Sequence, residues 1–265
     1  MDALDWYYVY SPKYEIFHQL IYNSVGDCSG FKLHPRFFPQ SAFSTLYKPG
    51  SEHFFAGNCL KFNVMLDAMA ACDGRYIIVS DADLCVLKSD ELRTYLNAYM
   101  NYDIVYMRDN FENTTLNIGF GLIKCTHATL AFFTEVRNII ANTGRQDQAI
   151  VNELLAEHPE LSVGMFSTPE MIQSNMYHVF KTEEDKICIV QMLCSGTSYE
   201  YNFVEKLLTA YLFYDLRDLE PLIPDYAWNT IVKYIQDNRI QNPLTNCEFK
   251  CDDPSKFEET SAPSL

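Results

Sequence analysis

Two acids at the end of an apolar run are the feature that most constrains this chain. The run Tyr76-Ile77-Ile78-Val79-Ser80 has the composition of a buried strand, and Asp81-Ala82-Asp83 follows it directly. Like charges this close oppose each other, so the pair is easiest to hold when a cation lies on it. Carboxylate oxygens suit hard divalent ions such as Mg²⁺ and Mn²⁺, which usually also take phosphate oxygens from a substrate. The sequence therefore predicts a metal–nucleotide site where this strand ends.

Composition limits the class of protein. The chain has 265 residues, 48% of them hydrophobic, which is enough to bury a substantial core. Its formal net charge of −15 argues against nucleic acid or an anionic membrane as the main partner. No apolar run approaches the roughly 18 residues that a membrane span needs. We therefore expect a folded protein with no membrane span and no nucleic-acid partner.

The cysteines indicate a reducing compartment. There are nine, an odd number, and most lie inside apolar runs, where a free thiol behaves as a small hydrophobic side chain. The N-terminal residues Met1-Asp2-Ala3-Leu4-Asp5 do not have the pattern of a secretory leader. We expect a cytoplasmic protein without a disulfide framework.

Apolar runs and helical periodicity alternate along the chain. Strands are predicted at 6–10, 76–80, 103–107, 117–125, 161–166 and 187–193. Helices are predicted at 14–24, 58–72, 89–100, 126–141, 145–157, 202–214 and 225–237, whereas 26–56 has no clear period and is predicted to be a long functional loop. This alternation is typical of an α/β layer fold with a mostly parallel central sheet flanked by helices. Ligands in such sheets collect beyond the carboxyl ends of the strands, which is where the acid pair lies.

Three motifs in order give the chain a recognisable pattern. They are Ser80-Asp81-Ala82-Asp83, then Asn117-Ile118-Gly119-Phe120, then Gln146-Asp147-Gln148-Ala149-Ile150-Val151-Asn152. Over roughly residues 6 to 210 the chain resembles a nucleotide-sugar glycosyltransferase of the GT-A fold. More narrowly, it is similar to the small soluble glycosyltransferases of large algal (chlorella) viruses. The resemblance implies a GT-A domain over 1–215. Residues 216–251 fall outside it and are predicted to form a helical C-terminal extension, and the polar stretch 252–265, with two prolines, is predicted to be a disordered tail.

The resemblance assigns roles on the metal and nucleotide side of the site. It implies that Asp83 ligates Mn²⁺ or Mg²⁺ directly, that Asp81 touches the ribose or a metal-bound water, and that the Ala82 backbone passes close to the nucleotide. Tyr10 and Ser11, which end the first strand, would cradle the base and ribose. A metal across both phosphates would neutralise the charge that grows on the departing nucleoside diphosphate.

Lys61 and the two later motifs complete the implied site. Lys61 would contact the diphosphate as a point charge, and Asn117, Gly119 and Gln148 would line the sugar pocket. Asp147 would face the donor sugar. In an inverting transfer it would be the base that accepts the proton of the acceptor hydroxyl, and in a retaining transfer it would hold donor hydroxyls. Its position in the first turn of a helix also has a purely structural explanation, because the helix dipole favours an acid there.

One departure from the family pattern concerns the third metal ligand. Relatives often carry a histidine on a late strand, near the stretch that runs here from Ile187 to Leu193, and this stretch contains none. Gln191 lies where the histidine would be expected, and His178 is the other candidate. An amide oxygen is a weaker ligand than a carboxylate, so Gln191 would leave the metal with more water.

The predicted function is metal-dependent transfer of a sugar from a nucleotide diphosphate, most readily a UDP-sugar, to a hydroxyl of a glycan or glycoprotein. If the viral resemblance holds, the location is the host cytoplasm. Two alternatives remain. One is a non-catalytic module that binds a nucleotide or glycan. The other is a phosphohydrolase of the haloacid dehalogenase type, whose motif has Thr or Val where this chain has Cys85.

Overall fold

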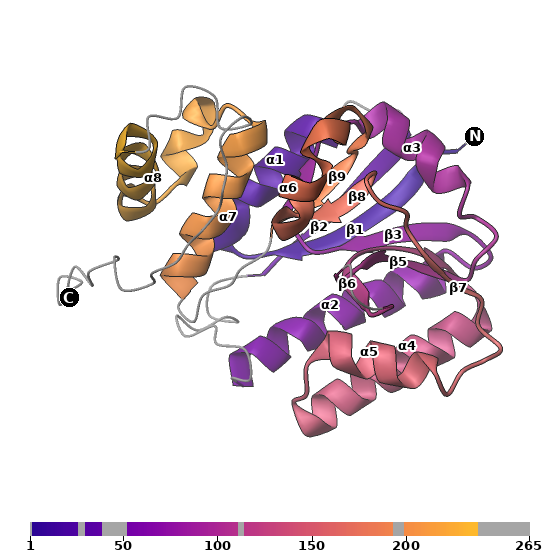
Figure 1. The fold of residues 1–265 in the computed structure, drawn as a ribbon. Helices are drawn as coiled ribbons and strands as arrows, with labels where there is room; N and C mark the ends of the chain where they lie inside the picture. The colour runs from indigo at the N-terminus through magenta and orange to yellow at the C-terminus, as the bar shows by residue number, and fades with distance from the viewer. Residues whose placement is uncertain (1, 26–29, 39–51, 111–113, 193–198, 238–265) are drawn as a thin grey trace.

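A six-stranded sheet forms the centre of the computed structural model, which describes residues 2–25, 30–38, 52–110, 114–192 and 199–237 (Figure 1). The strands are arranged in the order β2 (Phe31–Phe37), β1 (Leu4–Tyr10), β3 (Tyr76–Ser80), β6 (Leu116–Lys124), β5 (Ile104–Arg108) and β7 (Val163–Met165). β1 is parallel to β2 and β3, and β5 is parallel to β7, whereas β6 runs antiparallel to both β3 and β5. The predicted mostly parallel sheet is confirmed.

Helices cover both faces of this sheet. On one face lie α2 (Glu52–Ala71), α4 (His127–Thr143) and α5 (Asp147–Leu155), and on the other lie α1 (Glu15–Val25), α3 (Ser89–Asn97) and α7 (Tyr199–Phe213) (Figure 1). Side chains of β3 alternate between the two resulting cores: Ile77 and Val79 pack with α2 and α4, and Ile78 packs with α1. This is the layered α/β architecture expected from the sequence.

A second, smaller sheet lies on the α1 side of the molecule. Its strands are β4 (Leu84–Val86), β9 (Ile189–Gln191) and β8 (Met171–Gln173), in that order. The sequence predicted only the strand at 187–193, because β9 lies in a longer apolar run, whereas β4 and β8 are three-residue strands that show no recognisable period. The sheet matters for the site, because β4 begins directly after the acid pair and Leu84 pairs with Gln191.

The stretch 26–56 corrects a prediction. It was expected to be a loop, but residues 31–37 form the edge strand β2 and α2 begins at Glu52 rather than at 58. The strand escaped notice because an edge strand can be polar and can contain proline, as Pro35 shows here, and its partner β1 supplies the pairing. Residues 26–29 and 39–51 lie outside the described residues.

The C-terminal helices pack on the main core. α8 (Asp225–Asp237) follows a short 3₁₀ helix at Arg217–Leu222, and its prediction at 225–237 is confirmed. Leu216, Ile223, Ala227 and Ile231 are buried in the same core as α1 and the small sheet. The domain boundary at 215 stays a prediction, and the predicted tail lies outside the described residues. The remaining short helices are Pro12–Tyr14, Ser174–Met176, α6 (Tyr177–Phe180) and Lys181–Lys186.

Two other expectations concern location. Within the described ranges, no helix has the length and apolarity needed to cross a membrane. Five cysteines fall in these ranges and carry free thiols, namely Cys59, Cys72, Cys85, Cys125 and Cys188.

A buried hydrogen bond ties β1 to β3 just before the acid pair. The indole N–H of Trp6 donates to Ser80 Oγ at 2.8 Å, and both residues are fully buried. The Ser80 hydroxyl in turn donates to the Asp81 carbonyl at 2.9 Å. Ser80 therefore satisfies a buried donor and fixes the backbone where the chain leaves the strand.

We expect Ser80→Ala to lower the free energy of unfolding by about 1–3 kcal/mol, because the Trp6 N–H would stay buried without an acceptor. Urea unfolding followed by tryptophan fluorescence measures the change. The matched control is Thr230→Ala, which removes an exposed hydroxyl that bonds only to its own helix, at the Tyr226 carbonyl, and should change stability by no more than about 0.5 kcal/mol. Equal effects of the two variants would contradict this account of Ser80.

Candidate functional site

The registers of the central strands bring the motifs to one edge of the sheet. Tyr8 is level with Ser80 in the β1–β3 pair, and Ser80 is level with Phe120 in the antiparallel β3–β6 pair. The residues that follow β1 and β3 therefore emerge beside those that begin β6. The Asp81 N–H donates to the Gly119 carbonyl at 2.8 Å, so the acid pair and the 117–120 motif are neighbours, as predicted.

Lys61 reaches this edge from α2. Its Nζ lies 2.6 Å from Asp81 Oδ1 and 3.3 Å from the Ile118 carbonyl oxygen. Burial alone would lower the pKa of Lys61, but Asp81, Asp147 and Asp83 together raise it, so the side chain stays charged. The ammonium of Lys61 thus links the first two sequence motifs directly, and the charge of Asp147 from the third motif acts on it.

The carboxylates are crowded. Burial raises the pKa of Asp81, the neighbouring Lys61 lowers it, and the charges of Asp83 and Asp147 raise it again, with a net increase. Asp147 is itself buried, at the first position of α5. Such crowding favours an additional positive charge at the site.

Asp83 has a buried lysine of its own. Lys206 of α7 donates to Asp83 Oδ2, and the side chains of Lys206 and Asp83 are only 7% and 10% exposed. The Lys206 Nζ also donates to the Tyr14 hydroxyl at 3.3 Å and lies 5.3 Å from the centre of the Tyr14 ring. The other carboxylate oxygen, Asp83 Oδ1, is buried without a hydrogen-bond partner among the described residues.

Sequence analysis missed Lys206, although one signal was present. Lys206 lies three residues after Phe203 and one before Leu207, and both of these side chains are buried in the core. A lysine in the apolar stripe of a helix is unusual, because burial of an unpaired ammonium is strongly unfavourable. Its position therefore indicated a buried acid nearby, but not which acid.

Gln191 lies beside the acid pair, because β9 pairs with β4. Its amide nitrogen is 3.4 Å from Asp81 Oδ2, whereas its oxygen Oε1 is buried with no partner in the described part of the chain. Gly119 leaves the room that this side chain needs, since a Cβ at that position would lie 1.8 Å from Gln191 Nε2. The side chain of His178, the other predicted third ligand, lies outside what the structure describes.

These oxygens fit a divalent cation. Asp83 Oδ1 and Gln191 Oε1 are two buried acceptors without donors, on strands that are paired next to Asp81. Within the described residues there is no group of three His, Cys, Asp or Glu side chains placed to hold a metal. The available set is two carboxylates and one amide oxygen, which would leave the remaining positions of a Mg²⁺ or Mn²⁺ ion to water or phosphate.

Asp109 joins the two later motifs, and sequence analysis missed it. It follows β5 directly, and its Oδ1 accepts hydrogen bonds from Gln148 Nε2 at 2.9 Å, Gln173 Nε2 at 3.4 Å and Asn117 Nδ2 at 3.5 Å. The predicted sugar-site residues Asn117 and Gln148 therefore meet on one carboxylate. The available signal was an acid at a strand end, the same signal that identified Asp81.

Asn152 has a structural role in the third motif. Its side-chain amide makes two 2.9 Å hydrogen bonds with the backbone of Leu116, accepting from the N–H and donating to the carbonyl. It also donates to the Gln148 carbonyl at 2.8 Å. Asn152 thus fastens α5 to the start of β6 and holds Gln148 at the site.

Tyr10 and Ser11 lie at the same sheet edge, at the end of β1. The Tyr10 ring stacks on His18 with centroids 4.3 Å apart and packs edge-on against Phe37 at 5.5 Å. The Ser11 carbonyl accepts a hydrogen bond from the Tyr14 N–H at 2.8 Å. One face of Tyr10 is therefore covered by His18, and Phe37 beside it is 53% exposed.

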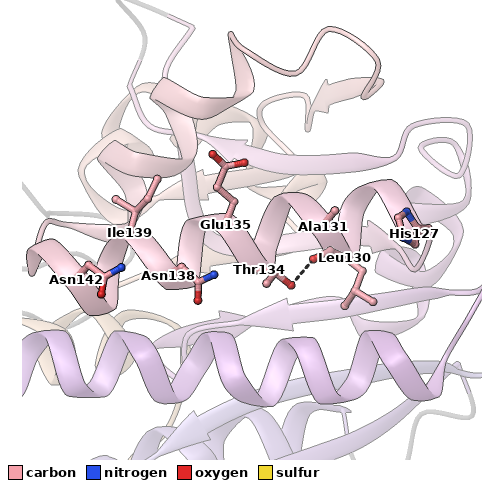
Figure 2. A pocket seen from close by; sticks show the side chains of 8 residues that line it. All are labelled: His127, Leu130, Ala131, Thr134, Glu135, Asn138, Ile139 and Asn142. Atoms are coloured by element: carbon pink, nitrogen blue, oxygen red, sulfur yellow. Dashed lines mark hydrogen bonds between the residues drawn. The ribbon is translucent and has the colours of Figure 1, made fainter.

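A separate groove runs along α4. Figure 2 shows it lined by side chains of that helix, among them His127, Thr134, Glu135 and Asn142. None of the predicted site residues lines it. The chemistry-bearing groups gather at the sheet edge, so we take that edge, and not the groove, as the candidate active site.

Comparisons with known proteins were made with both sequence and structure. Residues 31–200 match the family model of nucleotide-diphospho-sugar transferases. No curated protein matches the sequence. Among solved structures, a glycosyltransferase involved in glycosylation of the major capsid of PBCV-1 aligns with 79% of this chain and 99% of its own length, at 13% identity and a TM-score of 0.51.

Two further solved structures are less similar. Mouse xyloside xylosyltransferase 1 has 13% identity and a TM-score of 0.45, and the alignment covers 73% of this chain and 98% of that enzyme. The glycosyltransferase GlyE of Streptococcus pneumoniae has 14% identity and a TM-score of 0.47, with 90% of this chain and 64% of that one covered. At these identities the structural likeness concerns the fold.

We expect Lys61→Met to lower the free energy of unfolding by about 2–3 kcal/mol, because Asp81 and Asp147 would face each other without the ammonium. The loss is smaller than for a fully buried pair, since the Asp81 side chain is 37% exposed and solvent screens it. Adding Asp81→Asn to Lys61→Met should recover part of the loss, which a double-mutant cycle in urea measures.

The surface pair of Lys186 with Glu183, at 2.7 Å, supplies the control. Lys186→Met should leave stability close to that of the wild type, because solvent screens this exposed pair. Strictly additive effects of Lys61→Met and Asp81→Asn would show that the ion pair does not couple the two residues.

Proposed function

Because the chain belongs to the nucleotide-diphospho-sugar transferase family, we propose that its sheet-edge site transfers a sugar from a UDP-sugar to a hydroxyl of a glycan or glycoprotein. The glycosyltransferase class and the family resemblance expected from the sequence are confirmed by this family match. The phosphohydrolase alternative belongs to a different family. Donor, acceptor and metal use are the parts of the proposal that need experiment.

The observation that carries the proposal is that Lys61 joins the acid pair to the 117–120 motif by direct contacts. Lys61 contacts Asp81 and the Ile118 carbonyl and is influenced by the charge of Asp147. A nucleotide diphosphate is an anion that needs positive charge, and a sugar needs hydrogen-bonding groups for its hydroxyls. Lys61 and Lys206 supply the charge, and the amides of Asn117 and Gln148, both bonded to Asp109, supply the hydrogen bonds.

A divalent cation is part of the proposal. Glycosyltransferases of this fold generally use one, and Asp81, Asp83 and Gln191 would hold Mg²⁺ or Mn²⁺ here. When bound, the ion would neutralise charge on the leaving diphosphate. The residues around it have separate tasks. Lys61 donates a hydrogen bond to Asp81, and Gly119 leaves room for the Gln191 amide.

We assign the nucleotide to the end of β1 and the sugar to the start of β6. Tyr10 and Ser11 would contact the base and ribose, with the Ala82 backbone on the other side of the nucleotide. Phe37 would extend the aromatic surface that Tyr10 begins. The base is proposed as uracil from the family resemblance, and the acceptor as a glycan or glycoprotein in the cytoplasm, by likeness to the PBCV-1 capsid glycosyltransferase.

Asp147 would contact the donor sugar. Its side chain is buried at the N-terminus of α5. In an inverting transfer this carboxylate accepts the acceptor proton, and in a retaining transfer it holds donor hydroxyls. The stereochemistry of the product distinguishes the two roles.

We expect a UDP-sugar with Mn²⁺ to raise the melting temperature of the protein, and GDP- and TDP-sugars to raise it less, because only a ligand that binds the native state stabilises it. The Asp83→Asn variant should lose the Mn²⁺-dependent part of this shift. We choose Asn rather than Ala because Asp83 pairs with the buried Lys206, and the amide preserves a hydrogen-bond acceptor for that ammonium.

The exposed Asp67 on α2 provides a matched control. Asp67→Asn removes one negative charge elsewhere and should keep the whole shift. A shift that is the same in Asp83→Asn and in the wild type would exclude Asp83 as a metal ligand. No shift with any nucleotide sugar would contradict the proposed donor class.

We expect Asp147→Asn to reduce the rate of transfer by about 10²-fold or more while donor affinity changes little, if the carboxylate accepts the proton. If it holds the sugar, donor affinity should weaken as well. Release of UDP from the donor, measured with and without acceptor, separates the cases. Full activity of the variant would remove Asp147 from the site, and absence of turnover in the wild type despite donor binding would favour a non-catalytic binding module.

A further inference from the structure

Both acids of the Asp81-Ala82-Asp83 motif already have a buried cation. Lys61 is 2.6 Å from Asp81, and Lys206 donates to Asp83. Together with the buried Asp147, the site holds three carboxylates and two ammonium groups, a net charge of −1. A divalent ion that approached this arrangement would meet two positive charges as well as its ligands.

The two lysines are held differently. Lys61 has the Ile118 carbonyl as a second partner, and the charge of Asp147 also acts on it. Lys206 has the Tyr14 hydroxyl, at 3.3 Å, and the face of the Tyr14 ring, 5.3 Å from its centre. A phenol ring and hydroxyl can keep an ammonium close by when its carboxylate partner is taken, since the ring attracts the cation weakly.

The oxygens around Asp83 are incompletely satisfied. Lys206 occupies Asp83 Oδ2, while Asp83 Oδ1 and Gln191 Oε1 are buried without partners in the residues that the structure describes. A buried acceptor without a donor is energetically unfavourable, because it has lost its hydrogen bonds to water. Lys206 therefore neutralises the charge of Asp83 but leaves two potential metal ligands, Asp83 Oδ1 and Gln191 Oε1, without a partner among the described residues.

We propose that Lys206 is an exchangeable counter-ion of Asp83, which a divalent cation displaces and which then pairs with the diphosphate of the donor. Without metal, the ammonium keeps the buried carboxylate neutralised. When the metal binds Asp83, the Lys206 ammonium leaves that carboxylate, keeps its contact with Tyr14 and pairs with the diphosphate of the donor. This inference rests on the proposed function, because it takes Asp83 as a metal ligand.

Displacement of Lys206 by a metal predicts a different Mn²⁺ affinity from the one expected if Lys206 had only a structural role. The Lys206→Met variant has no ammonium to displace, so it should bind Mn²⁺ alone more tightly than the wild type, by about tenfold or more, since like charges at this range repel strongly in a partly buried site. In the presence of UDP the advantage should disappear or reverse, because the variant lacks the positive charge that pairs with the diphosphate. A structural lysine would weaken binding of Mn²⁺ in both cases.

The experiment is titration of Mn²⁺ into the full chain, with and without UDP, followed by the electron paramagnetic resonance signal of free Mn²⁺. Lys206→Arg is the matched variant that keeps the charge, and it should stay close to the wild type. Lys186→Met removes a lysine from the surface pair with Glu183 and should have no effect. Unchanged or weaker binding of Mn²⁺ alone by Lys206→Met would overturn the proposal.

A second measurement protects the test if Lys206→Met does not fold. The side-chain ¹⁵Nζ resonance of Lys206 in the wild-type protein, assigned by its loss in Lys206→Arg, should shift when Mg²⁺ is added, whereas that of Lys186 should not. An unmoved Lys206 signal at a Mg²⁺ concentration that saturates the site would overturn exchange.

These experiments distinguish failure of the Lys206 exchange from failure of the proposed glycosyltransferase function. If neither wild type nor variant binds Mn²⁺, exchange is wrong, yet transfer of sugar in EDTA would leave the glycosyltransferase function intact. If Mn²⁺ binds as predicted but no nucleotide sugar is bound or consumed, exchange stands at the metal site and the donor class is wrong.

Discussion

The pairing of clustered acids with buried lysines is the interaction on which this site depends. Asp81 contacts Lys61, Asp83 contacts Lys206, and the buried Asp147 adds a third carboxylate at the same end of the sheet. Removal of these charges from water is unfavourable, so such pairs contribute little to net stability compared with apolar packing. In the proposed function, charges of both signs at this site would suit a substrate that combines a diphosphate with a neutral sugar.

Four parts of the fold contribute the side chains of this site. α2 brings Lys61 beneath the sheet, β3 ends in the acid pair, the small sheet places Gln191 against it, and α7 closes over Asp83 with Lys206 (Figure 1). The antiparallel strand β6 is central to this arrangement. It begins where the parallel strands end, so its first residues join the ligand-binding edge rather than the opposite one.

Much of the framework followed from local patterns. The apolar runs at β1, β3 and β5 and the stripe of α4 are long enough to be recognised. Thr126 caps α4, with its hydroxyl accepting from the Thr129 N–H. The three-residue strands β4 and β8 and the edge strand β2 were missed. Their pairing depends on partners far along the chain, and three residues or a proline-containing edge leave no periodic signal.

By itself, the sequence determined that two acids follow a buried strand, that Asn117, Gly119 and Asp147 accompany them in order, and that the family is one of nucleotide-sugar transferases. Only the tertiary structure decided which side chains complete the charges. Lys206 is 123 residues from Asp83, and Gln148 is 39 residues from Asp109. Such contacts are set by strand register and by the packing of helices on a sheet. These are properties of the whole fold, which no local pattern of residues encodes.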